Sequence, residues 1–396
     1  MRTAIIGGGA AGFFLAINLK EMMPAMDVVI MESAQKVLRK VAVSGGGRCN
    51  VTNTFEGIRD LKEVYPRGHR LMSRLFHTFS PQDAWQWFER RGVRLTAQAD
   101  HCVFPQSQDA HTIINLFLAE TKRLGVTVRT GCRIKSLDEM GDFDNICIAT
   151  GGQPRAEGLR WLGQDIVEPV PSLFTLSIAD SELNAQTGPV VPNATVFIPG
   201  TKLRAGGPLL LTHWGMSGPA ILRLSSYAAR HLAGCDYLSP LMVNWTSATE
   251  AEAIQAIDAL KKQCAQKLIT SVAPLQLPQR LWAYLCEKVI GQRANAPCRR
   301  AHVEPWGSLN AKEQRRLVNV LIADEYRSSG RAPHRDEFVT CGGVSLSAVN
   351  ATTLESRTRP GLYFAGEVLD IDGVTGGFNF QAAWTTAYTV ACAISH

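Results

Sequence analysis

The sequence has no long apolar run and no paired cysteines. None of its 396 residues lies in a stretch that reaches the about 20 consecutive apolar residues a membrane span needs. The opening MRTAIIGGGAAGFF runs from an apolar segment into a glycine turn, not into a cleavage site, so no signal peptide is expected. Ten cysteines are present, but no two form a CxxC pair. We therefore expect reduced thiols in a cytoplasmic protein with no membrane span, disulfide framework or metal site.

The chain also lacks internal repeats and low-complexity segments, and its charge is unevenly distributed. With 45% hydrophobic and 19% charged residues, it has the composition of a globular protein of two or three domains. Residues 191–338 hold 18 Lys and Arg against 11 Asp and Glu, whereas the remainder holds 23 against 24. The positive middle segment is either a solvated surface or one that meets a polyanion such as nucleic acid, and the sequence leaves both open.

A dinucleotide-binding pattern opens the chain. An apolar strand over residues 3–6 leads into glycines, a helix follows, and a second strand ends at Glu32. Gly7, Gly9 and Gly12 form GxGxxG, and the acid stands 20 residues after the last of them. These glycines allow a tight turn, close approach to a pyrophosphate and close packing of helix on strand. The helix N-terminus then offers N–H groups to the phosphates, and Glu32 can accept hydrogen bonds from a ribose diol.

Two further strand ends meet glycines far along the chain. A strand over 146–149 leads into TGG at 150–152, and a strand over 362–365 leads into Gly366-Glu367 before Gly376-Gly377 opens an Ala-rich helix. Such ends of parallel strands gather ligands at one sheet edge. Only one GxGxxG is present, and a second anchoring region near the C-terminus favours FAD over NAD. No second nucleotide motif is present that could distinguish NADH from NADPH as a further cofactor.

The middle of the chain has a different pattern. Short apolar runs between Pro, Gly and Thr over 191–247 predict antiparallel strands of a small barrel or sheet. Residues 248–323 predict helices, with N-cap signals at Ser247 and Asn310, and a helix after Pro278 that Gly291 closes. The predicted domains are a Rossmann-like FAD domain over 1–190 and 339–396, a β-barrel-like insert over 191–247 with 324–338, and a helical insert over 248–323.

The segment KVAVSGGGRCNVTN, residues 40–53, is dense in groups that contact a ligand. Ser44 and the three glycines after it provide backbone N–H groups and room for close approach to a flavin or pyrophosphate. Lys40 and Arg48 can balance phosphate charge. Asn50 and Asn53 can bond the polar edge of a flavin, or can equally stabilise the loop through backbone hydrogen bonds.

Five motifs together resemble the BaiN/RdsA family of FAD-dependent oxidoreductases over essentially the whole chain. They are IIGGGAAG (5–12), KVAVSGGGRCNVTN (40–53), CIATGG (147–152), GGPLLLTHWGMSGPAIL (206–222) and GLYFAGEVLDIDGVTGGFNFQAAW (361–384). The resemblance implies an α/β fold in which a Rossmann-like FAD-binding domain is interrupted by an insert with a β-barrel-like part and a helical part. It implies reduction of activated C=C bonds, in bile-acid enones or in a uracil of large-subunit ribosomal RNA. The expected cofactor positions, which lie on these motifs except for Glu32, are Gly7, Gly9, Ala10, Ala11, Gly12, Glu32, Lys40, Ser44, Gly45, Gly47, Arg48, Asn50, Asn53, Ala149, Thr150, Gly151, Gly366, Glu367, Asp370, Gly376, Gly377 and Asn379.

Reduction of such a bond needs a proton donor besides a hydride, and two residues are candidates. Cys49, beside Arg48 and among backbone donors, is expected to have a lowered pKa and to deliver a proton, or else to be a small buried apolar residue. His213, next to Trp214, is the second candidate, and is otherwise a structural histidine.

Three functions remain open at this stage. The first is reduction of a uridine in 23S ribosomal RNA to dihydrouridine with electrons from NAD(P)H. The second is reduction of a small steroid-like enone, and the third is a flavin-bearing RNA-binding protein without turnover. Basic clusters at 90–94, 298–300 and 314–316, with Trp306 near the last two, could bind RNA phosphates and stack on a base, or could be solvated faces.

Overall fold

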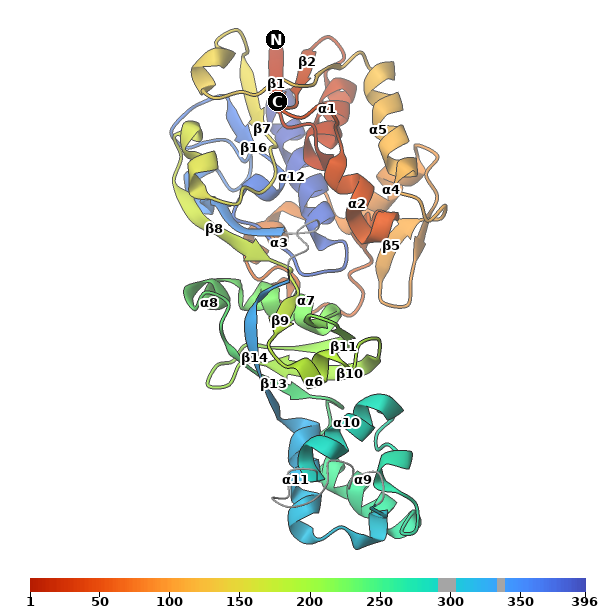
Figure 1. The fold of residues 1–396 in the computed structure, drawn as a ribbon. Helices are drawn as coiled ribbons and strands as arrows, with labels where there is room; N and C mark the ends of the chain where they lie inside the picture. The colour runs from red at the N-terminus through yellow and green to blue at the C-terminus, as the bar shows by residue number, and fades with distance from the viewer. Residues whose placement is uncertain (291–303, 333–338) are drawn as a thin grey trace. The chain divides into compact units, whose positions relative to one another are not determined.

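The computed structural model describes residues 1–290, 304–332 and 339–396, and the chain forms two compact units (Figure 1). The first unit combines Met1–Leu173 with Asp336–His396, and the second is Phe174–Arg335. The sequence predicted an insert beginning at residue 191, but β9 (Leu176–Ile178) already pairs with strands of the second unit. The finer division into a barrel insert and a helical insert stays a prediction.

A five-stranded parallel sheet forms the centre of the first unit, in the order β16-β7-β1-β2-β6. The strands are β1 (Arg2–Ile6), β2 (Asp27–Met31), β6 (Thr127–Arg129), β7 (Asn145–Ile148) and β16 (Leu362–Phe364). Ile6 lies opposite both Met31 and Ile148, so the carboxyl ends of the three central strands meet at one edge. This is the edge at which sheets of this class bind ligands.

Two helices from opposite ends of the chain pack together on this sheet. α1 (Ala10–Met22) lies beside α12 (Phe378–Ser395), and the rings of Phe14 and Trp384, both fully buried, are 5.1 Å apart (Figure 1). The remaining helices of the unit are α2 (Arg39–Gly47), α3 (His69–Leu75), α4 (Pro81–Glu89) and α5 (His111–Arg123). Within the described ranges no helix, α12 included, is long and apolar enough to cross a membrane.

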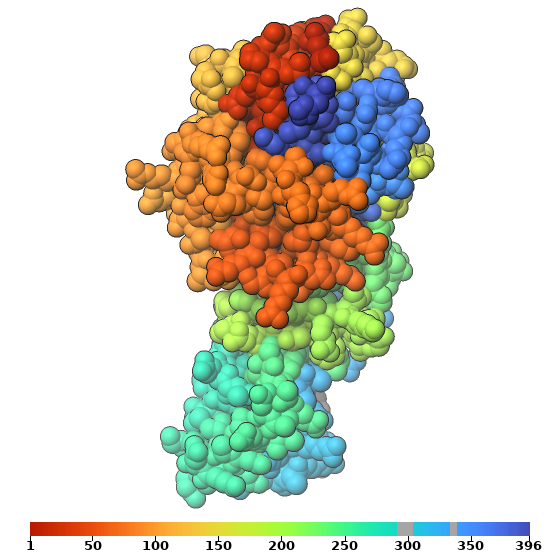
Figure 2. All heavy atoms as spheres, turned by 180° about the vertical axis from the view of Figure 1, so that it is seen from behind, coloured from red at the N-terminus to blue at the C-terminus, as the bar shows by residue number. Residues whose placement is uncertain are grey.

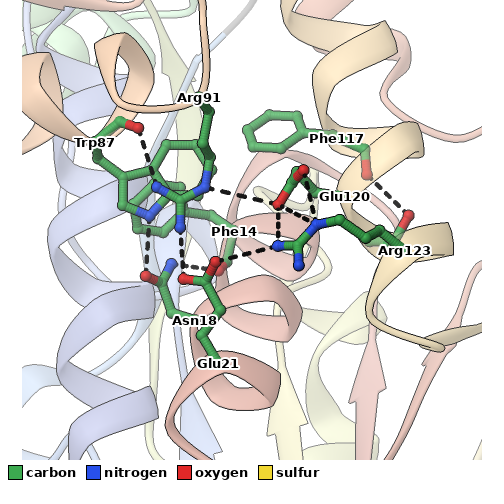
Figure 3. Close-up of polar contacts among 9 residues, drawn as sticks. Phe14, Asn18, Glu21, Trp87, Arg91, Phe117, Glu120 and Arg123 are labelled. Carbon is green, nitrogen blue, oxygen red and sulfur yellow. Dashed lines mark hydrogen bonds and ion pairs between the residues drawn. The ribbon is translucent and has the colours of Figure 1, made fainter. Parts of the chain in front are cut away.

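A polar network joins α1, α4 and α5 (Figure 3). Asn18 Oδ1 accepts a hydrogen bond of 3.0 Å from the indole N–H of Trp87, and the guanidinium of Arg91 lies 3.8 Å from the centroid of that indole. Arg91 also bonds Glu21 at 2.5 Å and faces Glu120 at 3.9 Å. The charge of Arg91 is therefore neutralised within the fold.

Smaller sheets complete the first unit. β3 (Thr52–Asn53), β5 (Cys102–Pro105) and β4 (Leu95–Ala97) form an antiparallel sheet beside the carboxyl edge residues, and β8 (Ile166–Ser172) pairs with β15 (Val339–Val344). The last pair joins the segment that leaves the first unit to the segment that returns, so this unit is discontinuous in sequence.

A closed antiparallel barrel forms part of the second unit, as the sequence predicted. Its order is β10-β11-β12-β9-β14-β13. The strands besides β9 are β10 (Val190–Phe197), β11 (Arg204–Thr212), β12 (Gly215–Ser217), β13 (Pro240–Asn244) and β14 (Asp324–Arg331), with α6 (Ser181–Asn184), α7 (Pro219–Tyr227) and α8 (Ala229–Gly234) between them.

Among the described residues of the second unit, three longer helices follow: α9 (Glu250–Gln263), α10 (Gln279–Ile290) and α11 (Ala311–Ile322). The predicted cap at Ser247 is wrong, because Thr249 caps α9 in a reciprocal pair with Glu252. The predicted cap of α11, Asn310 with Glu313, is present. Gly291, predicted to close α10, lies outside the described residues.

Candidate cofactor site

The glycine turn after β1 is packed on two sides and open on the third. Gly7 has a φ of +120°, and a Cβ at Gly7 or at Gly12 would overlap backbone carbonyl oxygens, of Ala149 and of Gly7 respectively. Neither position tolerates a side chain. At Gly9, in contrast, no atom lies within 4 Å of where a Cβ would be. Ala10 and Ala11 follow in the first turn of α1, whose N-terminus has no side-chain cap.

Glu32, directly after β2, lies beside this turn. One carboxylate oxygen accepts a hydrogen bond of 2.8 Å from Gly8 N, and the other accepts one of 2.7 Å from Ala34 N. These bonds fix the carboxylate. The oxygen that bonds Ala34 N also accepts from Ser33 Oγ at 3.2 Å, whereas the oxygen that bonds Gly8 N keeps a further lone pair. The arrangement suits the predicted bond to a ribose hydroxyl.

The segment over 40–53 begins as a helix and kinks at its glycines. α2 loses helical geometry at Ser44, and Gly45 and Gly46 have φ of 56° and 68°. Gly46 and Gly47 are exposed, with no atom within 4 Å of where a Cβ would be, so their backbone can be approached closely. Arg48 bonds the carbonyl of Gly45 at 3.1 Å and stacks on Phe104 at 4.2 Å. Its guanidinium thus holds the kink in place, a contact the sequence did not predict.

Asn50 and Asn53 join this segment to the turn before α12. The Asn53 amide donates to the carbonyl of Gly376 at 3.0 Å and accepts from Phe55 N at 2.9 Å. Asn50, in the amide orientation that satisfies its neighbours, accepts from Gly377 N at 3.0 Å. The structure therefore shows the loop-stabilising contacts that the sequence left as an alternative. Asn379 likewise bonds both the N–H and the carbonyl of Gly373.

The carboxyl end of β7 meets the loop after β16. Glu367 accepts hydrogen bonds from Lys40 Nζ at 2.6 Å and from Thr340 N at 2.9 Å. Ala149 is buried at the end of β7, and Gly151 follows with a φ of +73°. Gly366 N donates to Thr386 Oγ1 at 2.8 Å, and Asp370 N to the carbonyl of Val344 at 3.0 Å. The structure brings all five predicted cofactor segments into the first unit.

Of the two alternatives for Cys49, the structure contradicts the lowered pKa and agrees with the small buried residue. Burial raises the pKa of this thiol to about 12, and a hydrogen bond with Ser44 opposes the shift only in part. The side chain is fully buried, and the backbone of Cys49 is left-handed, with φ +60°. The thiol is therefore protonated at neutral pH and shielded from solvent.

His213 lies in the second unit, at the two-residue turn between β11 and β12. It is exposed, and its ring meets that of Trp214 edge to face at 4.3 Å. Thr212 Oγ1 donates to the carbonyl of Gly215 at 3.0 Å and closes the turn.

The three basic clusters differ in whether their side chains are paired within the fold. Arg91 of the cluster at 90–94 is bound in the network of Figure 3. The cluster at 298–300 lies outside the described residues. Trp306, predicted to be able to stack on a base, is fully buried and stacked on Trp282 at 5.9 Å, so it belongs to the core. The residues at 315 and 316 are exposed on α11.

One ion pair at this edge was missed by the sequence reasoning. Arg67 bonds both oxygens of Asp372, which is fully buried and also accepts 3.0 Å from Ser172 Oγ. The pair joins the segment before α3 to the loop before α12. No local pattern in the sequence signals it, because the partners are 305 residues apart.

The residues at this edge fit a dinucleotide. The N-terminus of α1 has no side-chain cap, and space is open above Gly9, Gly46 and Gly47. Thr150 Oγ1, at the end of β7, is buried without a hydrogen-bond partner in the described chain. A diphosphate accepts hydrogen bonds from such unpaired donors.

Comparison with known proteins agrees with this fit. A protein named ribosomal RNA dihydrouridine synthase from Escherichia coli is 29% identical to this chain, and the alignment covers 98% of this chain and 96% of that protein. One named 3-dehydro-bile acid delta(4,6)-reductase from Clostridium scindens is 24% identical, over 98% and 97%. The structure of 3-ketosteroid delta1-dehydrogenase from Sterolibacterium denitrificans shares the fold, with a TM-score of 0.50, 11% identity and 99% coverage of both chains. The model of the HI0933-like protein Rossmann domain matches residues 1–393. The chain therefore belongs to the HI0933-like Rossmann family of FAD-dependent oxidoreductases.

Proposed function

We propose that this protein takes electrons from NAD(P)H and reduces the 5,6 double bond of a uridine in 23S ribosomal RNA, giving dihydrouridine. The observation that carries the proposal is the similarity, over nearly the whole length, to two proteins named ribosomal RNA dihydrouridine synthase. The positive balance of residues 191–338 adds to it, because an RNA substrate is a polyanion and a small enone is not.

The residues of the carboxyl edge divide into those that bind the cofactor and those that hold the binding loops. Gly9 and the first turn of α1 would hold the pyrophosphate, and Glu32 would accept a hydrogen bond from the ribose. Gly46 and Gly47 have exposed backbone that a flavin could approach closely. Bound FAD would supply hydride transfer to one carbon of the C=C bond, and a proton completes the other carbon.

Two residues are the candidates for delivering that proton. Cys49 carries a proton at neutral pH, as a donor must, but its burial means that the thiol reaches a substrate only if the kinked segment moves. His213 is exposed. Separate Cys49→Ser and His213→Gln variants test them. Loss of the donor slows reoxidation of the flavin by substrate and leaves its reduction by NAD(P)H unchanged.

The function is tested with FAD-loaded protein, NADH or NADPH, and unmodified large-subunit ribosomal RNA. Mass spectrometry of the digested RNA should show a two-hydrogen increment on a uridine. The same increment should be missing from ribosomal RNA of cells that lack the protein. Flavin that is reduced by the nicotinamide yet leaves the RNA unchanged contradicts the proposal.

A second candidate is reduction of a small enone, favoured by the similarity to the protein named 3-dehydro-bile acid delta(4,6)-reductase. It predicts that a steroid enone reoxidises the reduced flavin in the absence of RNA. Reoxidation by the enone together with an unmodified RNA would decide for this function.

A further inference from the structure

The proposed function leaves open which surface binds the RNA, and α11 differs from the basic segment at 90–94, whose Arg91 is paired within the fold. The reciprocal cap of Asn310 and Glu313 fixes where this helix begins and therefore which side chains face outward. Its inner face is apolar, with Leu317, Val320 and Leu321 buried. The outer side chains are Lys312, Arg315, Arg316 and Asn319.

These four residues form one stripe. Side chains three and four positions apart are neighbours on a helix, roughly 5–6 Å apart at Cβ. The name α11 stripe is used below for the three charged members of this row, which are Lys312, Arg315 and Arg316. In Figure 2 the light-blue atoms of the stretch around α11 lie uncovered on one side of the second unit.

The charges of the α11 stripe are not neutralised. Glu313, the single acid of the helix, is 4% exposed and accepts from Asn310 N in the cap. Among the described residues, none of the three stripe side chains makes an ion pair or a hydrogen bond. Asp258, on the neighbouring α9, is bonded by Gln314 instead.

The contrast with the first unit is informative. There Arg91 is paired with two glutamates, Arg67 with Asp372, and Arg48 with a carbonyl and a ring. Those arginines hold the fold together. The α11 stripe contributes nothing comparable to the fold, and three adjacent cations without a counter-charge suit a partner with regularly spaced negative charges.

We propose that the α11 stripe binds the phosphate backbone of the RNA, an inference that rests on the proposed function for the identity of that RNA. Each cation that neutralises a phosphate releases a counterion. It therefore contributes about 0.7 (single strand) to about 0.9 (duplex) to the slope of log affinity against log salt. Three cations therefore contribute about 2 to 3 to this slope. Between about 1 M and about 0.1 M salt, that slope corresponds to a gain in affinity of roughly 100- to 500-fold.

The test is Lys312→Gln/Arg315→Gln/Arg316→Gln in the full-length FAD-loaded protein. Glutamine matches lysine and arginine in helix propensity, so the melting temperature and FAD content should not change. The matched control is Lys122→Gln/Arg133→Gln/Lys135→Gln, which removes three exposed charges from the first unit. A charge-retaining variant, Arg315→Lys/Arg316→Lys, should bind as the unchanged protein does.

Binding is measured to poly(U) and to a transcript of large-subunit ribosomal RNA at several salt concentrations, with dihydrouridine formation followed in parallel. The inference expects a slope lower by about 2 to 3 in the stripe variant alone, and a raised KM with unchanged kcat. A salt slope that is unchanged in the stripe variant overturns the inference, and so does an equal loss of slope in the control variant. The inference is also overturned if the stripe variant loses binding to phosphatidylglycerol vesicles but keeps its binding to RNA. If the unmodified protein binds RNA through the stripe but forms no dihydrouridine, the proposed function fails while the RNA surface stands.

Discussion

Two glycines of one motif should respond differently to the same substitution. Gly9 has φ −94° and ψ −168°, which alanine adopts freely, and no atom lies within 4 Å of the new Cβ. Alanine restricts the unfolded chain, which adds about 0.4–1 kcal/mol of stability, but it is a poorer N-cap than glycine, and Gly9 is the N-cap of α1. Because the two effects oppose each other, Gly9→Ala should change the stability of the FAD-free protein by less than about 1 kcal/mol, or less than about 4 °C in melting temperature.

The same methyl group fills the space that the pyrophosphate would occupy. Losing one hydrogen bond to a charged group costs about 1.5–3 kcal/mol, which weakens FAD binding about 10- to 150-fold. In Gly12→Ala the new Cβ overlaps the carbonyl oxygen of Gly7, so α1 must move away from β1. We expect that variant to lose at least about 1–3 kcal/mol of stability even without FAD.

Thermal unfolding of the FAD-free proteins and fluorescence titration with FAD separate the two effects. The reasoning predicts a stable, weakly binding Gly9→Ala protein and an unstable Gly12→Ala protein. Undiminished FAD affinity in Gly9→Ala would show that the pyrophosphate does not lie at the N-terminus of α1. An undiminished melting temperature in Gly12→Ala would show that the helix and strand are not packed as described.

Three other predictions concern the first unit. The pKa of the Cys49 thiol is about 12 in the fold and near 9 in the unfolded chain, because burial disfavours the thiolate. The buried neutral thiol therefore adds its full stability below pH 9, and this stability is lost as the pH rises from 9 toward 12. Mass spectrometry after alkylation at pH 8 should find the thiol unmodified in the native protein, and alkylation there would refute its burial. A hydrogen bond from Arg123 is the main cause that lowers the pKa of Glu120. The ionised Glu120 carboxylate therefore stabilises the fold at neutral pH, and this stabilisation is lost as the pH falls below the ordinary glutamate range. In urea unfolding, Glu120→Gln should lose less stability on acidification than the unchanged protein does. Arg67→Met leaves the buried Asp372 carboxylate without its ion-pair partner and should lower the free energy of unfolding by about 3–5 kcal/mol. Adding Asp372→Leu should restore part of that loss. A double variant that is no more stable than Arg67→Met would contradict the pairing.

Features set by local spacing could be predicted from the sequence. The GxGxxG turn and the strand ending at Glu32 follow from short-range rules of periodicity and backbone sterics, and the antiparallel barrel follows from its apolar runs. The cap of α11 was also predictable, because Asn310 and Glu313 are three residues apart. At α9 two such pairs compete within a few residues, and the sequence alone favoured the wrong one.

Burial and partner choice could not be predicted, since they depend on residues distant in the chain. The environment of Cys49 looked electropositive because Arg48 precedes it, but the thiol is fully buried, whereas the guanidinium of Arg48 bonds the carbonyl of Gly45 and stacks on Phe104. The sequence left Arg91 as either a nucleic-acid contact or part of a solvated face, and the fold pairs it with Glu21 and Glu120 instead. Trp306 looked available for stacking on a base, and instead packs against Trp282.

The discontinuity of the first unit constrains the order in which the chain can fold during its synthesis. Its edge strand β16 and the helix that covers Phe14 both come from beyond residue 336. A ribosome adding about 5–20 residues per second makes the intervening second unit in roughly 10–30 s. Throughout that interval the emerging N-terminal half exposes the apolar face of α1, so a nascent chain halted before residue 336 should be cut readily by protease where the released, full-length chain is resistant.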